Sequence, residues 1–227
     1  MIALAASSSD LYTAVAEQLF GSRQTSQDLR GLRNEVKVAF LSAMYGGGTG
    51  STALAALRRG FPRATAVLED AAVQGEIGGI VHSVLGRPCP PPSPGWFDEA
   101  GQGVERSSEK ARSRGRFTRN FIVQASAADW ANVLVACLRR ELDALARHSS
   151  DDSSADSSAG SDGPRAELVF FQHDEFIVHA PDEQTDEVVA ALGRAGAEAT
   201  RLVLGPHAPA IPLEARVVRS YADPAPT

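Results

Sequence analysis

The chain has 227 residues, enough to bury one good hydrophobic core or two small ones. Hydrophobic residues make up 43% of it and charged residues 22%, a composition typical of ordinary globular proteins. The formal net charge of −6 argues against a protein that simply coats DNA.

Two helices are predicted at the start of the chain. Apolar residues recur at helical spacing over residues 10–20, where Asp10 is a suitable N-cap and Gly21 a helix stop. A second helix is predicted over residues 29–45, because the glycine run 46–48 ends its periodic pattern.

One face of the second helix carries a row of side chains at every fourth position: Arg33, Lys37, Leu41 and Tyr45. Residues four apart lie one above another on an α-helix, ~6 Å apart along the axis. The row therefore presents two cations, an apolar side chain and an aromatic ring, which suits the charged tail and stackable base of a nucleoside triphosphate. The alternative is an exposed helix face that includes Glu35, with Tyr45 as a core aromatic.

The next segments predict shorter elements. Helices are expected over residues 53–57 and 62–73, and the β-branched-rich residues 76–87 predict a small hairpin. Residues 88–103 contain five prolines and are expected to form a loop.

Charge is distributed unevenly along the chain. Residues 104–120 carry six Lys or Arg against two Glu, and this local excess of +4 favours a phosphate-contacting surface. The alternative is the solvated face of a charged helix. Residues 148–163 carry four Asp without Lys or Arg, so they hold −4 of the net charge of −6. This Ser/Asp tract is too poor in apolar groups to offset the entropy of ordering, and a disordered linker is predicted.

The remaining elements predict a helix and then a β-α-β pattern. A long amphipathic helix is expected over residues 127–147, with Ser126 as its N-cap. The elements after the tract are two strands, a helix and a closing strand, over residues 166–171, 176–180, 186–204 and 213–218. Helices first and a β-α-β half second predict an α+β fold with two lobes.

Three segments, in this order, resemble motifs of the polymerase I-like (family A) DNA polymerases. Residues 33–46 resemble the nucleotide-binding helix, R-x3-K-x3-[FY]-x3-Y-G, and residues 116–129 resemble the helix start R-x3-N-x3-Q-G-[ST]-A-A-[DE]. Residues 168–178 resemble the hairpin that carries His-Asp-Glu, the third polymerase motif. Weaker similarities are found at residues 10–21, which precede the nucleotide-binding helix, and at 85–87, in a fingers loop.

The resemblance implies the right-hand architecture of these enzymes without its thumb. Residues 1–115 would form a helical, fingers-like region with the nucleotide-binding helix 29–45, and residues 116–227 a palm-like antiparallel sheet with the insert 148–163. The family's first catalytic motif, a strand with an Asp, would precede residue 10, and the chain begins at Met1, too late to include it. We therefore expect the C-terminal fingers and palm portion of a polymerase.

The implied function is template-directed DNA synthesis, the transfer of a nucleotide from a dNTP to a primer 3′ end, by a DNA-directed DNA polymerase. Such transfer uses two Mg²⁺ ions held by carboxylates. By resemblance, Asp174 is the second catalytic aspartate and a metal ligand, His173 contacts the primer terminus, and Glu175 lies beside them. With one carboxylate cluster present, we expect the isolated chain to be inactive.

The resemblance also assigns the two rows. Arg33 and Lys37 would bind the β- and γ-phosphates, Leu41 would lie near the incoming sugar and base, and Tyr45 would lie under the templating base pair.

The second row would contact the minor groove of primer-template DNA, and its members are Arg116, Asn120 and Gln124. Asn and Gln can pair with minor-groove acceptors that occur at every base pair, which suits a sequence-independent enzyme. The alternative is a polar helix stripe.

Three residues depart from the family pattern. Leu41 replaces the expected Phe or Tyr, Phe171 stands where Gln is usual, and Tyr12 replaces a His. These changes leave the expected metal and triphosphate roles in place, but they remove the basis for inferring fidelity or sugar selectivity.

Two alternatives to a polymerase part stay open. The first is a catalytically incomplete DNA- or nucleotide-binding remnant. The second alternative is a scaffold protein that binds partners through the Ser/Asp tract 148–163.

Cysteine usage and hydropathy bear on location. Cys89 and Cys137 fit no metal-binding spacing and are expected to be reduced thiols in a cytoplasmic protein. No continuous run reaches the 18 or more apolar residues of a membrane span, so no membrane partner is expected. The expected partners are primer-template DNA and dNTPs, bound by a monomer.

Overall fold

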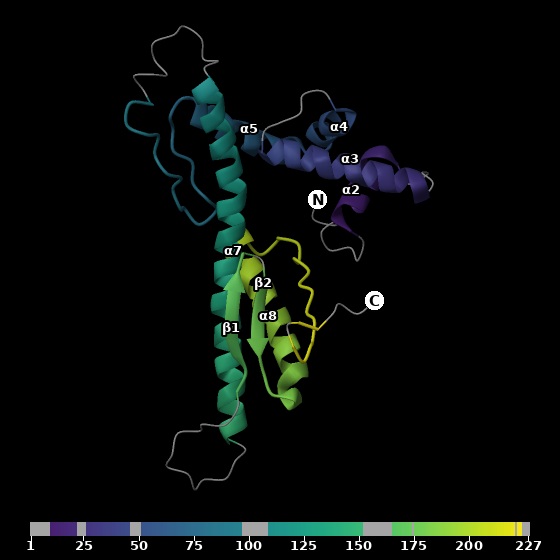
Figure 1. The fold of residues 1–227 in the computed structure, drawn as a ribbon, viewed down its shortest axis with the longest axis vertical. Coiled ribbons are helices and arrows are strands. Elements are labelled where there is room, and N and C mark those ends of the chain that lie inside the picture. Colours follow the sequence, from purple (N-terminus) through teal and green to yellow (C-terminus); the bar gives the residue numbers. More distant parts are fainter. Residues whose placement is uncertain are drawn as a thin grey trace. The chain divides into compact units, whose positions relative to one another are not determined.

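A computed structural model describes most of the chain, in seven ranges: residues 10–21, 26–45, 51–96, 109–151, 165–173, 175–220 and 222–223. It divides into two compact units, Met1–Asp129 (unit 1) and Trp130–Thr227 (unit 2). The described residues are mostly helical, with one two-stranded antiparallel sheet (Figure 1), so the α+β class is confirmed. The division between these two units falls after Asp129. The predicted boundary between a fingers-like and a palm-like region, after residue 115, stays a prediction.

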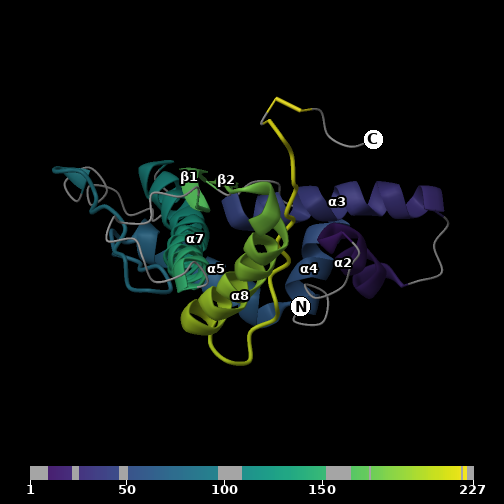
Figure 2. The same cartoon turned by 90° about the horizontal axis from the view of Figure 1, so that it is seen from below.

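Unit 1 is helical, and its described helices are α2 (Leu11–Phe20), α3 (Ser26–Tyr45), α4 (Thr52–Gly60), α5 (Pro62–Glu76) and the first part of α7 (Glu109–Asp151). The predicted ends of α2 are confirmed. Asp10 caps it by accepting a hydrogen bond from Thr13 N at 3.0 Å, and Gly21 ends it at φ 90°. Apolar residues of α2, α3 and α4 pack together around Val15, Val36 and Leu57, and Figure 2 shows these helices gathered side by side.

Helices α5 and α7 of unit 1 cross at small residues. Thr118 on α7 is fully buried, and its hydroxyl donates to the Ala71 carbonyl oxygen on α5 at 2.7 Å. A Cβ atom on Gly75 would lie 2.7 Å from the Arg114 carbonyl oxygen, and one on Gly115 would lie 2.9 Å from the Ala72 carbonyl oxygen. The two glycines therefore permit the close approach of the helix backbones.

Unit 2 packs one face of its sheet against helices. Its described elements are the rest of α7, β1 (Glu167–Gln172), β2 (Glu175–His179), the short 3-10 helix η1 (Asp182–Gln184) and α8 (Thr185–Leu204). The core combines Leu138 and Leu142 of α7 with Leu192 of α8, and alternate strand residues such as Phe176 and Val178 pack on it. In Figure 1, β1 and β2 lie side by side, as their antiparallel register requires.

The helix predicted over residues 127–147 is much longer, and the predicted N-cap at Ser126 is wrong. Ser126 lies inside α7, and its hydroxyl oxygen accepts a hydrogen bond from Val84 N at 3.0 Å. Residues 148–151, predicted to begin a disordered linker, form the end of α7. The rest of the tract lies outside the described residues.

Two predicted β elements are also wrong. Residues 76–87 form no pair of strands, because α5 extends to Glu76 and only one antiparallel bridge follows, between His82 and Pro88. Residues 213–218 form no strand either, and the only described partner of β2 is β1.

Among the described helices, α7 alone is long and apolar enough to cross a membrane by length and composition. Its apolar residues also supply Leu134, Cys137 and Leu138 to the core of unit 2. The expected lack of a membrane partner therefore stays a prediction.

Candidate functional site

The predicted row of Arg33, Lys37, Leu41 and Tyr45 lies on α3, and its side chains differ in their exposure to solvent. Arg33 is half-buried and Lys37 is exposed, while Leu41 and Tyr45 are 37% and 44% exposed. Tyr45 is therefore no core aromatic, and the apolar end of the row is open to a flat ligand. Within the described residues Lys37 forms no ion pair.

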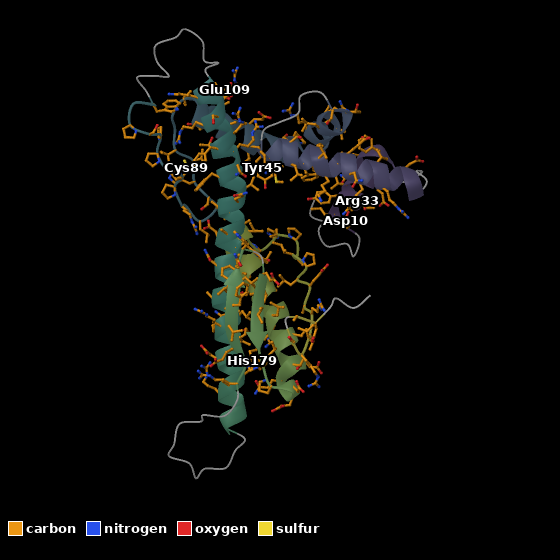
Figure 3. The ribbon with its side chains drawn as sticks, in the orientation of Figure 1. Asp10, Arg33, Tyr45, Cys89, Glu109 and His179 are labelled. Carbon is orange, nitrogen blue, oxygen red and sulfur yellow. The ribbon has the colours of Figure 1, made fainter. Side chains whose placement is uncertain are left out.

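Arg33 is held by α2 in a bidentate ion pair with Asp10. The distances are 2.9 Å from Arg33 Nε to Asp10 Oδ2 and 3.1 Å from Nη2 to Oδ1. The guanidinium also lies over the Tyr12 ring, 5.8 Å from its centroid. The hydrogen bond from Arg33 lowers the pKa of Asp10, and partial desolvation, which acts in the opposite direction, is outweighed. Figure 3 shows Asp10 and Arg33 next to each other.

The second row lies on the first part of α7, where two of its members have incomplete hydrogen bonding. Gln124 Nε2 lies 3.5 Å from the Tyr45 hydroxyl oxygen, at the long limit of a hydrogen bond. The Oδ1 atom of Asn120 is buried and has no partner among the described residues. Arg116 lies 3.6 Å from Glu109 in an exposed ion pair. The two predicted rows, 79 positions apart in sequence at Tyr45 and Gln124, thus meet inside unit 1.

Asp129 is a buried anchor that the sequence analysis did not single out. The residue is 3% exposed, and its carboxylate accepts hydrogen bonds from the Ser83 hydroxyl, from Leu85 N at 3.2 Å and from Arg87 Nη2 at 2.8 Å. Burial alone would raise the pKa of Asp129, but the hydrogen bonds and the charge of Arg87 outweigh it, so that the pKa lies below its ordinary value.

The contact of Asp129 ties the 83–87 turn to α7. Both segments were noted for their resemblance, but their contact was not predicted. The available signal was the position of Asp129 among the apolar residues of an amphipathic helix. A carboxylate that is buried there needs a hydrogen-bonding or charged partner, so this position predicts a contact with another segment.

The predicted His-Asp-Glu hairpin is present as the β1–β2 connection. Gln172 pairs with Glu175, so two residues join the strands, and His173 adopts a positive φ of 56°. A positive φ is usual in two-residue hairpin loops. His173 and Glu175 are exposed. Asp174 lies outside the described residues.

The predicted magnesium site stays a prediction, because Asp174 lies outside the described residues. These residues contain no group of three or more His, Cys, Asp or Glu side chains placed to hold a metal ion. Cys89 and Cys137 are both buried and free of disulfides, as their predicted reduced state requires.

Unit 2 also contains a groove of about 390 Å³ along β2. It is lined by this strand, α8 and residues 214–218, and the lining combines apolar Phe176 and Val188 with charged Asp182 and Arg216. Glu175 of the predicted His-Asp-Glu motif also lines it. No predicted DNA- or nucleotide-binding residue lines it.

No protein-family model matches the sequence, and no curated protein is similar to it at the sequence level. The fold, however, is similar to a solved structure described as the POL domain of Pol1 from M. smegmatis in complex with DNA primer-template and dNTP. The TM-score is 0.60 at 20% sequence identity, over 87% of this chain and 32% of that chain. The fold is therefore polymerase-like, and the chain spans about a third of the length of the solved chain.

Proposed function

We propose that the chain is the fingers and most of the palm of a family A DNA polymerase with the right-hand architecture. In the full enzyme it would direct the addition of dNTPs to the 3′ end of a primer on a DNA template. The polymerase-like fold over 87% of the chain supports this proposal, as do the three motifs that occur in the family's order.

The observation that carries the proposal is the meeting of the two rows at Tyr45 and Gln124. A polymerase must bring the incoming nucleotide and the end of the duplex to one place, because the new bond joins them. The row on α3 has the chemistry of a triphosphate site and the row on α7 that of a duplex contact. The contact between Tyr45 and Gln124 within unit 1 supports a site in which the two would lie side by side.

In this proposal the row on α3 binds the dNTP. Lys37 supplies a mobile point charge and Arg33 a planar donor fork to the β- and γ-phosphates. Leu41 and Tyr45 offer an exposed apolar surface to the sugar and to the templating base pair. These side chains bind and orient the nucleotide, which is most of what a protein contributes to phosphoryl transfer.

The row on α7 contacts the duplex. The amides of Asn120 and Gln124 carry N–H donors for minor-groove acceptors, and the exposed Arg116 reaches a phosphate or a base edge.

Magnesium is part of the proposal only through Asp174, which we propose as one metal ligand. Two Mg²⁺ ions, when bound, would stabilise the attacking and leaving oxygens of the transfer. A second carboxylate beside Asp174 would complete the two-metal site of this proposal.

A second candidate is a DNA- and nucleotide-binding chain without synthesis of its own, because the sequence matches one of the family's two aspartate motifs. Mg²⁺-dependent primer extension by the purified 227-residue chain separates the two candidates. Extension would exclude the binding-only function, and DNA binding without extension would favour it.

A duplex-binding assay tests the function that both candidates share. Fluorescence anisotropy of a labelled hairpin primer-template should show about tenfold weaker binding by the N120A/Q124A variant, because two hydrogen bonds are lost. The loss should be equal for duplexes of different sequence. The matched control is N132A, an exposed Asn farther along α7, which should bind like the wild type. Unchanged affinity of N120A/Q124A would contradict the assignment of the row.

A further inference from the structure

The cationic end of the α3 row is fixed by a residue outside it. Both oxygens of Asp10 contact the Arg33 guanidinium, at 2.9 Å and 3.1 Å, although the two residues are 23 positions apart. Figure 3 labels this pair at the contact of α2 with α3.

Asp10 is itself held in place. Its Oδ2 atom accepts hydrogen bonds from Thr13 N at 3.0 Å and from Thr13 Oγ1 at 3.1 Å, which fixes the carboxylate at the N-terminus of α2. The Tyr12 ring, one residue before Thr13, packs edge-on against Phe40 of α3 and lies against the guanidinium. Arg33 is thus held by α2 through a carboxylate and an aromatic ring.

The geometry of the pair leaves part of the guanidinium available. Arginine has five N–H donors, and Asp10 occupies those on one edge, at Nε and Nη2. Among the described residues, the Nη1 atom has only a long contact of 3.5 Å with Asn34 Oδ1. The edge formed by Nη1 and the second Nη2 hydrogen can therefore donate two hydrogen bonds to a phosphate while Asp10 stays bound.

We infer that Asp10 is a positioning residue for the triphosphate: it holds Arg33 in place with its second donor edge open to the terminal phosphate. This inference rests on the proposed function, because it takes Arg33 as a triphosphate ligand. Asp10 acts through Arg33 and does not touch the nucleotide. An arginine that is ordered before binding avoids the entropy cost of immobilisation, which corresponds to about threefold to tenfold in affinity.

The test is the affinity of the purified chain for dGTP and dGDP with Mg²⁺, measured by calorimetry. The D10N variant keeps an N-cap acceptor for Thr13 but loses the charge and one of the two acceptor oxygens. We expect it to bind dGTP about tenfold more weakly and dGDP with a smaller loss, since dGDP lacks the γ-phosphate that the open edge of Arg33 would contact. D10S, which also caps a helix but is too short to reach Arg33, should behave like D10N.

Two further variants isolate the route of the effect. S51A removes the N-cap of α4 in the same unit, where Ser51 Oγ accepts from Leu54 N at 3.0 Å, and should leave both affinities unchanged. In the R33A background, D10N should cause no additional loss, because its effect passes through the guanidinium.

The outcomes are distinguishable. Unchanged or tighter dGTP binding by D10N, or an equal loss in the R33A background, would overturn the positioning role while leaving the proposed function intact. If R33A itself leaves dGTP binding unchanged, the triphosphate site on α3 is refuted, and the inference falls with it.

Discussion

Individual carboxylates organise unit 1 at the residue scale. Asp10 links α2 to Arg33, and Asp129 links α7 to the 83–87 turn, each through more than one hydrogen bond. Neither role can be predicted from the local sequence, because each aspartate lies more than 20 positions from these partners. Asp129, unlike Asp10, is buried, so its replacement should lower the free energy of unfolding.

We predict that D129A destabilises the chain by about 2–4 kcal/mol, because it leaves the Ser83 hydroxyl and Leu85 N–H without an acceptor and Arg87 without its pair. Urea unfolding at pH 7 measures this. R87A removes only the half-exposed partner, with a side chain 49% exposed, and should cost less. A larger loss for R87A than for D129A would contradict this account.

The same carboxylate predicts a pH dependence. Since the pKa of Asp129 is lowered below 3.8 by folding, its contribution to stability is complete above that value and disappears as the pH falls through the folded-state pKa. The difference in unfolding free energy between wild type and D129N should therefore be constant above about pH 5 and shrink below it. A difference that stays constant into strong acid would refute the lowered pKa.

At the element scale, α7 is the feature that sequence reasoning described least well. Helical periodicity over residues 127–147 was recognised, but the helix begins at Glu109, so that the Arg116–Gln124 row and the predicted helix are one element. Ser126 misled the prediction because serine is a strong N-cap signal, and only a tertiary contact, to Val84 N, shows that its hydroxyl is used elsewhere. The strand predicted at 213–218 was wrong for a related reason, because a strand requires a hydrogen-bonding partner that local sequence does not name.

The close crossing of α5 and α7 gives a prediction at this scale. G75A should destabilise the chain by about 1–3 kcal/mol, since its Cβ would lie 2.7 Å from the Arg114 carbonyl oxygen and would also meet Thr118. Gly31 is the matched control, because a Cβ there on α3 meets nothing within 4 Å. G31A should stabilise by about 0.5–1 kcal/mol through helix propensity. Thermal unfolding of both variants tests this, and destabilisation by G31A or tolerance of G75A would contradict the packing described.

At the scale of the whole molecule, the chain has two compact units with separate cores, and the boundary between them lies within α7. Its polymerase-like fold corresponds to about a third of the solved polymerase domain. The activity is therefore proposed for a whole enzyme that would contain this chain, and it is tested in such an enzyme.

In a full enzyme that contains this chain, D174A should abolish primer extension and leave primer-template binding largely intact, because a metal ligand is lost and the duplex contacts are kept. Primer extension and a gel-shift assay on the same preparation measure both. D143A, which changes an exposed aspartate of α7, should extend normally. Substantial residual extension by D174A would refute its assignment as a metal ligand.

The sequence by itself determined the positions of most helices, the two strands of the hairpin, and the spacing of the Arg33–Tyr45 and Arg116–Gln124 rows. These features depend on residues three or four apart, or on alternate residues, so local periodicity is sufficient to predict them. Tertiary structure alone decided that Tyr45 meets Gln124, that Asp10 holds Arg33 and that Asp129 anchors the 83–87 turn. Periodicity predicts which face of a helix is buried, but the element that buries it depends on how the helices cross.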